Sequence, residues 1–189
     1  QNLTSSIVCA NNTQCNATNN PTNYSKNDVL ICQVTGKDNS SASESYNSST
    51  TTIQNTIPNI PTLNTPTNQS KTNNPNISFN YNSSDLDTDN ITYYLFIDSV
   101  LNTTTTNTTT NKTLGNGNHT WYVIANDGVA NSTQSNTFTF QIDTIGPNIT
   151  SITTNQTTTN VGQNLTISTN VTDSQNTVSN VWFSIWNGV

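Results

Sequence analysis

The chain has 189 residues, room for one or two ordinary domains, and only 7% of these residues are charged. Its formal net charge of −6 with four basic residues excludes a nucleic-acid binder, because phosphate contacts need clustered Lys or Arg. No apolar run approaches the roughly 18 to 20 residues of a membrane-spanning helix. The polar content is amide and hydroxyl instead, with 36 Asn, 38 Thr and 21 Ser.

Three cysteines, Cys9, Cys15 and Cys32, lie in the first 32 residues. Their spacing fits no zinc-binding pattern. In an exported protein one disulfide is expected, and one cysteine is then left over. From the residues alone all three pairings stay open, and a part of the protein outside this sequence could also supply a partner.

The chain repeats one pattern at a nearly constant spacing. Residues 27–60 match residues 116–149 without a gap at an offset of 89, and Val34 meets Val123 in this alignment. A second pair of segments, which begins at Asn76 and Asn164, matches at an offset of 88. Near-constant spacing is the signature of tandem domains, and this length is typical of a β-sandwich.

The stretch from residue 58 to residue 146 divides into short runs that alternate apolar and polar side chains. These runs are NISFNYN from Asn76, ITYYLFID from Ile91, HTWYVIA from His119 and NTFTFQID from Asn136. Their apolar side chains are expected to share one buried face: Ile77, Phe79, Tyr81, Ile91, Tyr93, Leu95, Ile97, Trp121, Val123, Ala125, Phe138, Phe140 and Ile142. Such alternation predicts antiparallel strands, and two such sheets face to face make a sandwich.

Two further segments lie between these strands or before them. The proline-rich segment 55–76 is interpreted as a stiff connector plus the first strand of the middle copy. Segment 102–113, NTTTTNTTTNKT, is open to three interpretations: an O-glycosylated tract, a plain loop or a frayed edge strand. Its three N-glycosylation triplets favour an exposed segment covered by sugar.

Two consecutive motifs carry a resemblance to a known family. L-x-x-G-x-x-T-W-Y-V-x-A-x-D-G at 114–128 and F-x-I-D-x-x-x-P-x-I at 140–149 resemble the immunoglobulin-like and fibronectin type III-like modules that occur in tandem in prokaryotic, notably archaeal, cell-surface proteins. The resemblance implies an all-β fold of Ig-like sandwiches of about 89 residues, with Trp121 in the core on the next-to-last strand. His119 stands where related sandwiches often place a corner tyrosine, so we expect it to staple a turn by hydrogen bonding.

The same alignment places Cys32 at the position of Trp121, inside the core of the first copy. Cys9 then falls near the strand that neighbours it in this fold. The resemblance therefore implies Cys9–Cys32 as a disulfide, with Cys15–Cys32 close behind.

The resemblance also implies incomplete domains at both ends. We expect a partial domain with the C-terminal strands at 1–57, a complete domain at 58–146 and a partial domain with the N-terminal strands at 147–189. Two explanations stay open: the sequence is a window of a longer tandem array, or the C-terminal strands of one molecule complete the N-terminal half-domain of the next. The second explanation gives a head-to-tail polymer.

Asparagine-linked glycosylation is the most abundant candidate modification. Nineteen N-x-S/T triplets, more than the composition predicts by chance, begin at Asn2, Asn11, Asn16, Asn23, Asn39, Asn47, Asn68, Asn76, Asn82, Asn90, Asn102, Asn107, Asn111, Asn118, Asn131, Asn148, Asn155, Asn164 and Asn170. The alternative is an Asn/Thr bias that comes from an AT-rich genome. We favour dense glycosylation, because hydrated sugars would replace charge as the source of solubility.

The segment SDLDTDN places Asp85, Asp87 and Asp89 at alternate positions of one predicted loop. Carboxylates arranged in this way can converge on Ca²⁺, and Asp127 of a neighbouring loop could join them. The competing interpretation is a solvated acidic turn. The EF-hand pattern fails, since Asn90 stands where Gly belongs and Phe96 where the bidentate Glu belongs.

Trp182 and Trp186 are four residues apart on a predicted strand and so share a face, which either stacks on sugar or is an ordinary surface that faces a sheet or another subunit. The sequence offers no Ser–His–Asp set with a usable His and no phosphate loop. We therefore expect a non-enzymatic, extracellular structural glycoprotein that forms a cell-surface filament, sheath or stalk and requires no cofactor. Its expected partners are copies of itself or further repeats of the same chain. The alternative is a cell-surface adhesin or receptor stalk.

Overall fold

The computed structural model describes residues 24–37 and 41–185, and every regular element in this part of the chain is a β-strand. The chain divides into two compact units, residues 1–56 and 57–189, which are described separately below. The first unit contains β1 (Val29–Leu30), β2 (Gln33–Lys37), β3 (Ala42–Asn47) and β4 (Thr51–Thr52). The second contains β5 (Thr62–Thr65), β6 (Ser70–Thr72), β7 (Asn76–Asn82), β8 (Thr92–Ile97), β9 (Val100–Thr105), β10 (Thr109–Thr113), β11 (Gly117–Asn126), β12 (Phe138–Ile142), β13 (Asn148–Thr154) and β14 (Ile167–Thr172).

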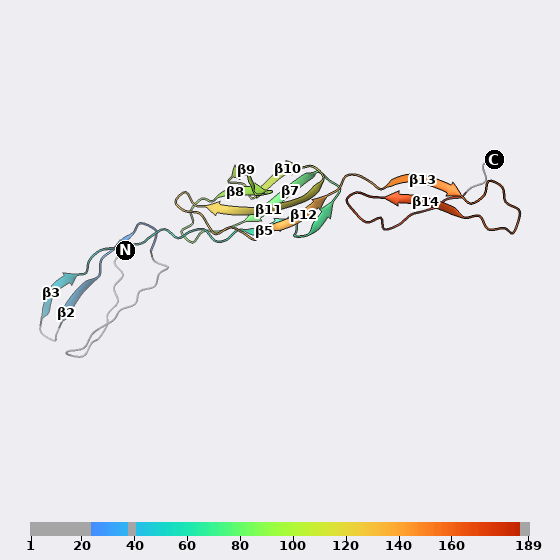
Figure 1. Ribbon diagram of the computed structural model, residues 1–189. Coiled ribbons are helices and arrows are strands. Elements are labelled where there is room, and N and C mark those ends of the chain that lie inside the picture. The colour runs from blue at the N-terminus through green and yellow to red at the C-terminus, as the bar shows by residue number, and fades with distance from the viewer. Residues whose placement is uncertain (1–23, 38–40, 186–189) are drawn as a thin grey trace. The chain divides into compact units, whose positions relative to one another are not determined.

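Strands β5 to β12 form a sandwich of two sheets (Figure 1). One sheet has the order β10–β7–β5, and the other has the order β6–β12–β11–β8–β9. All pairs are antiparallel except β6 with β12. The first strand is divided between the sheets and the last two strands pair with each other, which is the arrangement of an Ig-like sandwich. The predicted all-β Ig-like fold is therefore confirmed.

The core lies between these two sheets and is built from the alternating strands that the sequence predicts. Eleven hydrophobic side chains are buried in one cluster: Ile77, Phe79, Tyr81, Tyr93, Leu95, Ile97, Trp121, Val123, Ala125, Phe140 and Ile142. Ile91 and Phe138 pack against the cluster but are only half-buried. The ring of Phe79 meets the ring of Trp121 edge to face at a centroid distance of 5.1 Å, which is a favourable aromatic geometry.

Two segments that the sequence left open take definite positions in the sandwich. The proline-rich segment supplies β5 to one sheet and β6 to the other, with Pro66 between them, where a residue without an N–H interrupts strand pairing. The Thr-rich segment 102–113 supplies most of β9 and all of β10, which are edge strands of different sheets. The segment therefore forms edge strands and is not a plain loop.

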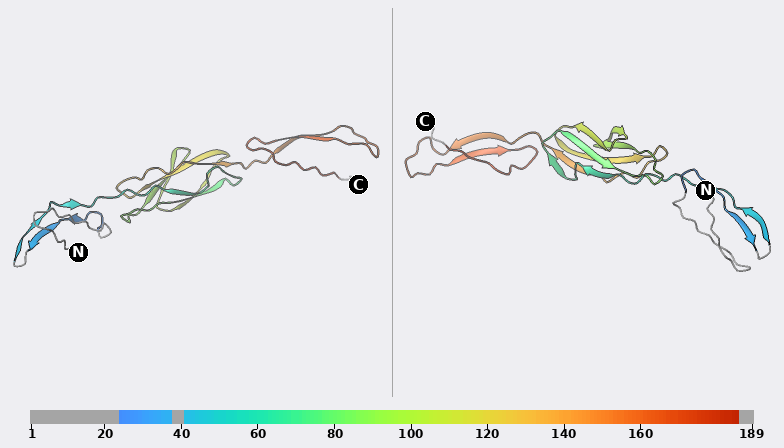
Figure 2. Two further views of the ribbon diagram at one scale, coloured as in Figure 1. Left: turned by 90° about the horizontal axis from the view of Figure 1, so that it is seen from below. Right: turned by 180° about the vertical axis from the view of Figure 1, so that it is seen from behind.

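Residues 148–172 form a two-stranded sheet of β13 and β14 (Figure 2). Ile152 pairs with Thr169, as Leu63 pairs with Tyr81 in the sandwich, and each of the two ladders contains one irregular step. The strand expected around Trp182 is not formed within the described residues, and this prediction is wrong. The equivalent strand of the sandwich, β8, is held by β11 and β9, and β13–β14 offers no such partner.

In the first unit, β1 pairs with β4 and β2 pairs with β3. None of the side chains whose exposure is described between Tyr24 and Thr56 is buried. Cys32 is exposed, so the prediction that it lies in a core is wrong. The described strands here form only two-stranded sheets, with no second layer to cover a side chain. Cys9 and Cys15, its predicted disulfide partners, lie outside the described residues.

Candidate functional site

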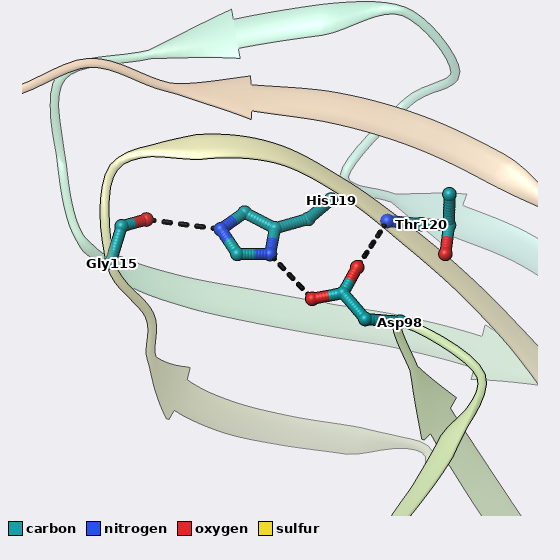
Figure 3. A network of polar contacts seen from close by, with 4 residues as sticks. All are labelled: Asp98, Gly115, His119 and Thr120. Atoms are coloured by element: carbon teal, nitrogen blue, oxygen red, sulfur yellow. Dashed lines mark hydrogen bonds and ion pairs between the residues drawn. The ribbon is translucent and has the colours of Figure 1, made fainter.

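His119 joins two turns at one end of the sandwich (Figure 3). Its Nδ1 lies 2.8 Å from Oδ2 of Asp98, and its Nε2 lies 3.0 Å from the carbonyl oxygen of Gly115. The other carboxylate oxygen of Asp98 accepts a hydrogen bond from the backbone N–H of Thr120 at 2.9 Å. The prediction that His119 staples a turn is confirmed.

The position of Asp98 follows from the tight hairpin between β8 and β9. Asp98 and Ser99 are the two loop residues, and both have positive φ angles, 51° and 66°. Two consecutive left-handed residues define a type I′ turn, whose twist matches the twist of the strands in a two-residue hairpin. Asp tolerates the left-handed conformation better than most residues. The turn thereby points the Asp98 carboxylate toward β11. The backbone N–H of Asp98 also donates a hydrogen bond to β11, at the carbonyl oxygen of Thr120.

The two partners of His119 favour its protonated state. Both are acceptors, a carboxylate and a carbonyl, and only the protonated ring can donate a hydrogen bond to each of them. Burial by itself lowers the pKa of His119, but the hydrogen bonds to Asp98 and Gly115 and the attraction to the carboxylate together raise it above 6.5. Burial likewise raises the pKa of Asp98, but the bonds from Thr120 and His119 hold it below 3.8.

These pKa shifts predict that the stabilisation by His119 depends on pH. The raised pKa of His119 gives stability that is complete below about pH 6.5 and is lost as the pH rises through the folded-state pKa. The lowered pKa of Asp98 gives stability that is present above about pH 3.8 and is lost as the pH falls through its folded-state pKa. We expect His119→Gln to destabilise the protein more at about pH 5 than at about pH 9.

Urea unfolding of both proteins at the two pH values measures this difference. It should be about 1 kcal/mol or less, because Asp98 is 47% exposed and water screens the pair. An equal effect of the substitution at both pH values would contradict a charged His119.

The predicted metal ligands are only partly brought together. Carboxylate oxygens of Asp85, Asp87 and Asp89 lie within 4.8 Å of one another in the loop between β7 and β8. Oδ1 of Asp85 accepts hydrogen bonds from the backbone N–H groups of Asp87 at 2.8 Å and Asp89 at 3.4 Å, as in a solvated turn. Asp127 does not join this group and instead accepts bonds from N–H groups of its own loop. Calcium binding therefore stays a prediction.

The candidate glycosylation sites share one feature of exposure. Fourteen of the nineteen lie in the described residues, and the asparagine of every one is exposed: Asn47, Asn68, Asn76, Asn82, Asn90, Asn102, Asn107, Asn111, Asn118, Asn131, Asn148, Asn155, Asn164 and Asn170. Four described asparagines are only half-exposed, namely Asn55, Asn80, Asn126 and Asn176, and none of them begins an N-x-S/T triplet. Nine of the thirteen described asparagines outside the triplets are exposed as well, so exposure is compatible with attachment at every described triplet but does not by itself distinguish the two groups.

The triplet asparagines share the side-chain atom that bonds to the protein. Five of the exposed triplet asparagines have side-chain hydrogen bonds, and all five use Oδ1: Asn68, Asn82, Asn102, Asn131 and Asn155. Asparagines outside the triplets use either atom: Asn64, Asn80 and Asn126 donate from Nδ2, whereas Asn74 and Asn116 accept through Oδ1. Since an N-linked glycan is attached to Nδ2, the hydrogen bonds of the triplet asparagines leave the acceptor nitrogen available.

An aromatic surface on the outer face of the larger sheet was not predicted. The rings of Phe96 and Tyr122 stack there at 4.6 Å with an interplanar angle of 11°. Tyr94 and Ile124 are the next outward pair along the same two strands. The signal was present in the sequence, because the outward positions of both strands carry aromatic or aliphatic residues where solvated strands usually carry polar ones.

Comparisons with known proteins do not assign this chain to a family. No protein-family model and no curated protein matches the chain. The crystal structure of the FN1–FN3 domains of chicken CNTN1 is similar at 11% identity and a TM-score of 0.38, over 68% of this chain and 49% of that one. This chain thus spans about half the length of that structure. The likeness is too low to carry an argument, and the Ig-like arrangement rests on the strand order. No helix in the described residues is long and apolar enough to span a membrane.

Proposed function

We propose that this chain is part of an extracellular structural glycoprotein, built of tandem Ig-like sandwiches, that forms a filament, sheath or stalk at a prokaryotic, notably archaeal, cell surface. The observation that carries the proposal is the set of fourteen described N-x-S/T asparagines, all exposed and none using Nδ2 in the hydrogen bonds described above. A chain with 7% charged residues needs another source of hydration, and glycans on this surface would supply it.

The tandem organisation is supported by matching strand registers. Val29 pairs with Thr52 in the first unit, and Asn118, 89 residues after Val29, pairs with Gln141, 89 residues after Thr52. The next pair along the ladder corresponds in the same way, Leu30–Thr51 with His119–Phe140. A repeated register is harder to obtain by chance than a repeated composition, because it requires two strands and their connection to keep the same lengths.

A non-enzymatic role is supported by the chemistry of His119. A general base needs a ring nitrogen with a free lone pair, and both nitrogens of His119 lie within hydrogen-bond distance of protein acceptors. In the loop between β7 and β8, Oδ1 of Asp85 likewise accepts hydrogen bonds from the backbone of its own turn. These contacts are structural.

Glycan mapping tests the proposal directly. We expect at least half of the nineteen acceptors to be occupied in protein purified from its native source, and the other asparagines to be bare. Intact mass before and after enzymatic or chemical deglycosylation, followed by peptide mapping, measures the occupancy of each site. The thirteen described asparagines outside N-x-S/T triplets are the internal control. If nearly all acceptors were unoccupied, the many N-x-S/T triplets would be explained by the composition of the genome and not by glycosylation.

A second candidate function, an adhesin or receptor stalk, is favoured by one observation. Trp182 is 89% exposed, and the stacked Phe96 and Tyr122 form a further uncharged aromatic surface. Such surfaces can stack on neutral sugars. A glycan array probed with the purified chain distinguishes the two functions, since a purely structural protein should give no saturable binding.

A further inference from the structure

The two outer faces of the sandwich differ in their chemistry. On the smaller sheet, the outward positions of β7 and β10 carry polar side chains throughout, among them Ser78, Asn80 and Asn111. On the larger sheet, the outward pair Phe96–Tyr122 stacks its rings at 4.6 Å. The outer face of a solvated sheet normally carries polar residues, so the aromatic surface of the larger sheet is a candidate contact surface.

The aromatic surface consists of Tyr94, Phe96, Tyr122 and Ile124, and none of these four side chains is buried. Leu101 of β9, which pairs with Phe96 and is 51% exposed, extends the surface toward the edge of the sheet. The four side chains carry no charge, and the two phenol hydroxyls are their only polar groups. A neutral sugar ring has apolar C–H groups and hydroxyls, so it matches a surface of this composition.

A β-bulge places a candidate glycosylation site at the border of the aromatic surface. Phe96 of β8 pairs with Leu101 of β9. The preceding residue of β8, Leu95, pairs with Thr103, so Asn102 is an extra residue in β9. Without the bulge, the residue after Leu101 would pair with the buried Leu95 and turn toward the core. The bulge gives this inward position to Thr103 and leaves Asn102 exposed.

Asn102 is also the triplet asparagine that lies best for reaching these rings. Neighbouring strands are about 4.8 Å apart, so a sugar on Asn102 starts beside Phe96. Oδ1 of Asn102 makes the hydrogen bond to the protein, and Nδ2 is left for the sugar. Asn118 lies four residues before Tyr122 in β11, and Asn131 is bridged to the residue four positions after it. Four residues of a strand span about 13 Å, so these two acceptors are more distant.

We propose that the glycan carried by Asn102 folds back onto the aromatic surface of its own sandwich, where its first sugar rings pack against Phe96 and Tyr122. The contact removes apolar surface from water and therefore stabilises the sandwich. It also makes the aromatic surface a structural contact of the glycosylated protein, which a sugar from solution finds already occupied. The inference rests on the proposed glycosylation of the chain.

Nuclear Overhauser effects between sugar protons and the ring protons of Phe96 and Tyr122 test the contact. We expect these effects in the glycosylated full chain, together with upfield shifts of the sugar protons from the ring currents. Thr104→Val removes the triplet of Asn102 and should abolish both signals. The matched control is Thr113→Val, which removes the triplet of Asn111 on the polar face of the other sheet and should retain both. The two replaced threonines are both exposed on edge strands.

Thermal unfolding of the same variants measures the stabilisation. In the glycosylated protein, Thr104→Val should lower the melting temperature by about 4–8 °C, and Thr113→Val should leave it nearly unchanged. After deglycosylation the two substitutions should have equally small effects, because both replace an exposed threonine by a residue of the same shape. The difference between the glycosylated and deglycosylated proteins therefore isolates the contribution of the glycan from that of the substitution.

Peptide mapping of the same samples separates the failure of this inference from the failure of the proposed function. An occupied Asn102 whose glycan gives no contacts with the rings, or equal melting temperatures of the two glycosylated variants, would overturn the inference alone. A bare Asn102 among occupied acceptors would do the same, as would saturable binding of a free sugar to the aromatic surface of the glycosylated chain. Bare acceptors throughout would overturn both the inference and the proposed glycosylation.

Discussion

Replacing Trp121 by alanine should destabilise the sandwich by about 3–5 kcal/mol, which is the usual cost of removing a large buried aromatic side chain. Trp121 is completely buried on β11 and lies between the two sheets. Its ring meets Phe79 at 5.1 Å and Phe138 at 6.0 Å, both edge to face, so the substitution removes these contacts and leaves a cavity. Because whole domains are stable by only about 5–15 kcal/mol, a large part of the stability depends on this one side chain.

Chemical denaturation followed by far-ultraviolet circular dichroism measures this loss. Trp182→Ala is the matched control, because the same atoms are removed from a side chain that is 89% exposed. The control should change the free energy of unfolding by less than about 0.5 kcal/mol, as is usual for surface substitutions. Similar losses in the two variants would contradict the assignment of residues 58–146 as a sandwich around Trp121.

Replacing Ser135 by alanine should cost about 1–3 kcal/mol although only one oxygen atom is removed. Ser135 is 4% exposed in the segment between β11 and β12. Its hydroxyl accepts a hydrogen bond from the N–H of Val123 at 3.0 Å and donates to the carbonyl of Asn136 at 2.9 Å. The alanine variant leaves the N–H of Val123 buried without this partner, and a buried donor that loses its acceptor pays the full cost of desolvation.

The same denaturation experiment measures the effect of Ser135→Ala, in protein produced without glycans. Thr133→Ala is the control, because it lies in the same segment with an exposed side chain and should be close to neutral. If hydrogen exchange shows that the Val123 amide is equally protected in both variants, the hydroxyl is not the partner that this amide requires.

The core of the sandwich could be predicted from the sequence, because the alternation of apolar and polar residues along a strand indicates which side chains are buried. Phe79, Leu95 and Val123 lie at alternate positions of short runs, and burial follows from that pattern. The connection to a second sheet was also predictable, because sheets with one apolar face must pack on another layer.

Other features could not be predicted, because they depend on contacts between residues far apart in the sequence. Nothing near Asp98 indicates that its carboxylate reaches Thr120, 22 residues away. The hydroxyl of Ser135 takes the place of a backbone carbonyl, and serine in a loop gives no signal of this role. Residues 181–185 show the opposite failure. Their alternation of apolar residues predicts a strand, but no strand is formed there.

In the exposed triplet asparagines with hydrogen bonds to the protein, Oδ1 makes the bond and Nδ2 remains for the proposed glycan. This affects how substitutions that remove the glycan should be chosen. At Asn68 the oxygen holds Thr139 of β12 while the nitrogen is left for the sugar. Exchanging such an asparagine for another residue would therefore remove the proposed glycan and a hydrogen bond of the protein together, and the phenotype could not be assigned to either. Altering the third residue of the triplet, as in Ser70→Ala, would prevent the proposed attachment and retain the amide oxygen. Substitutions of this second kind are the ones that would isolate what the proposed glycan contributes.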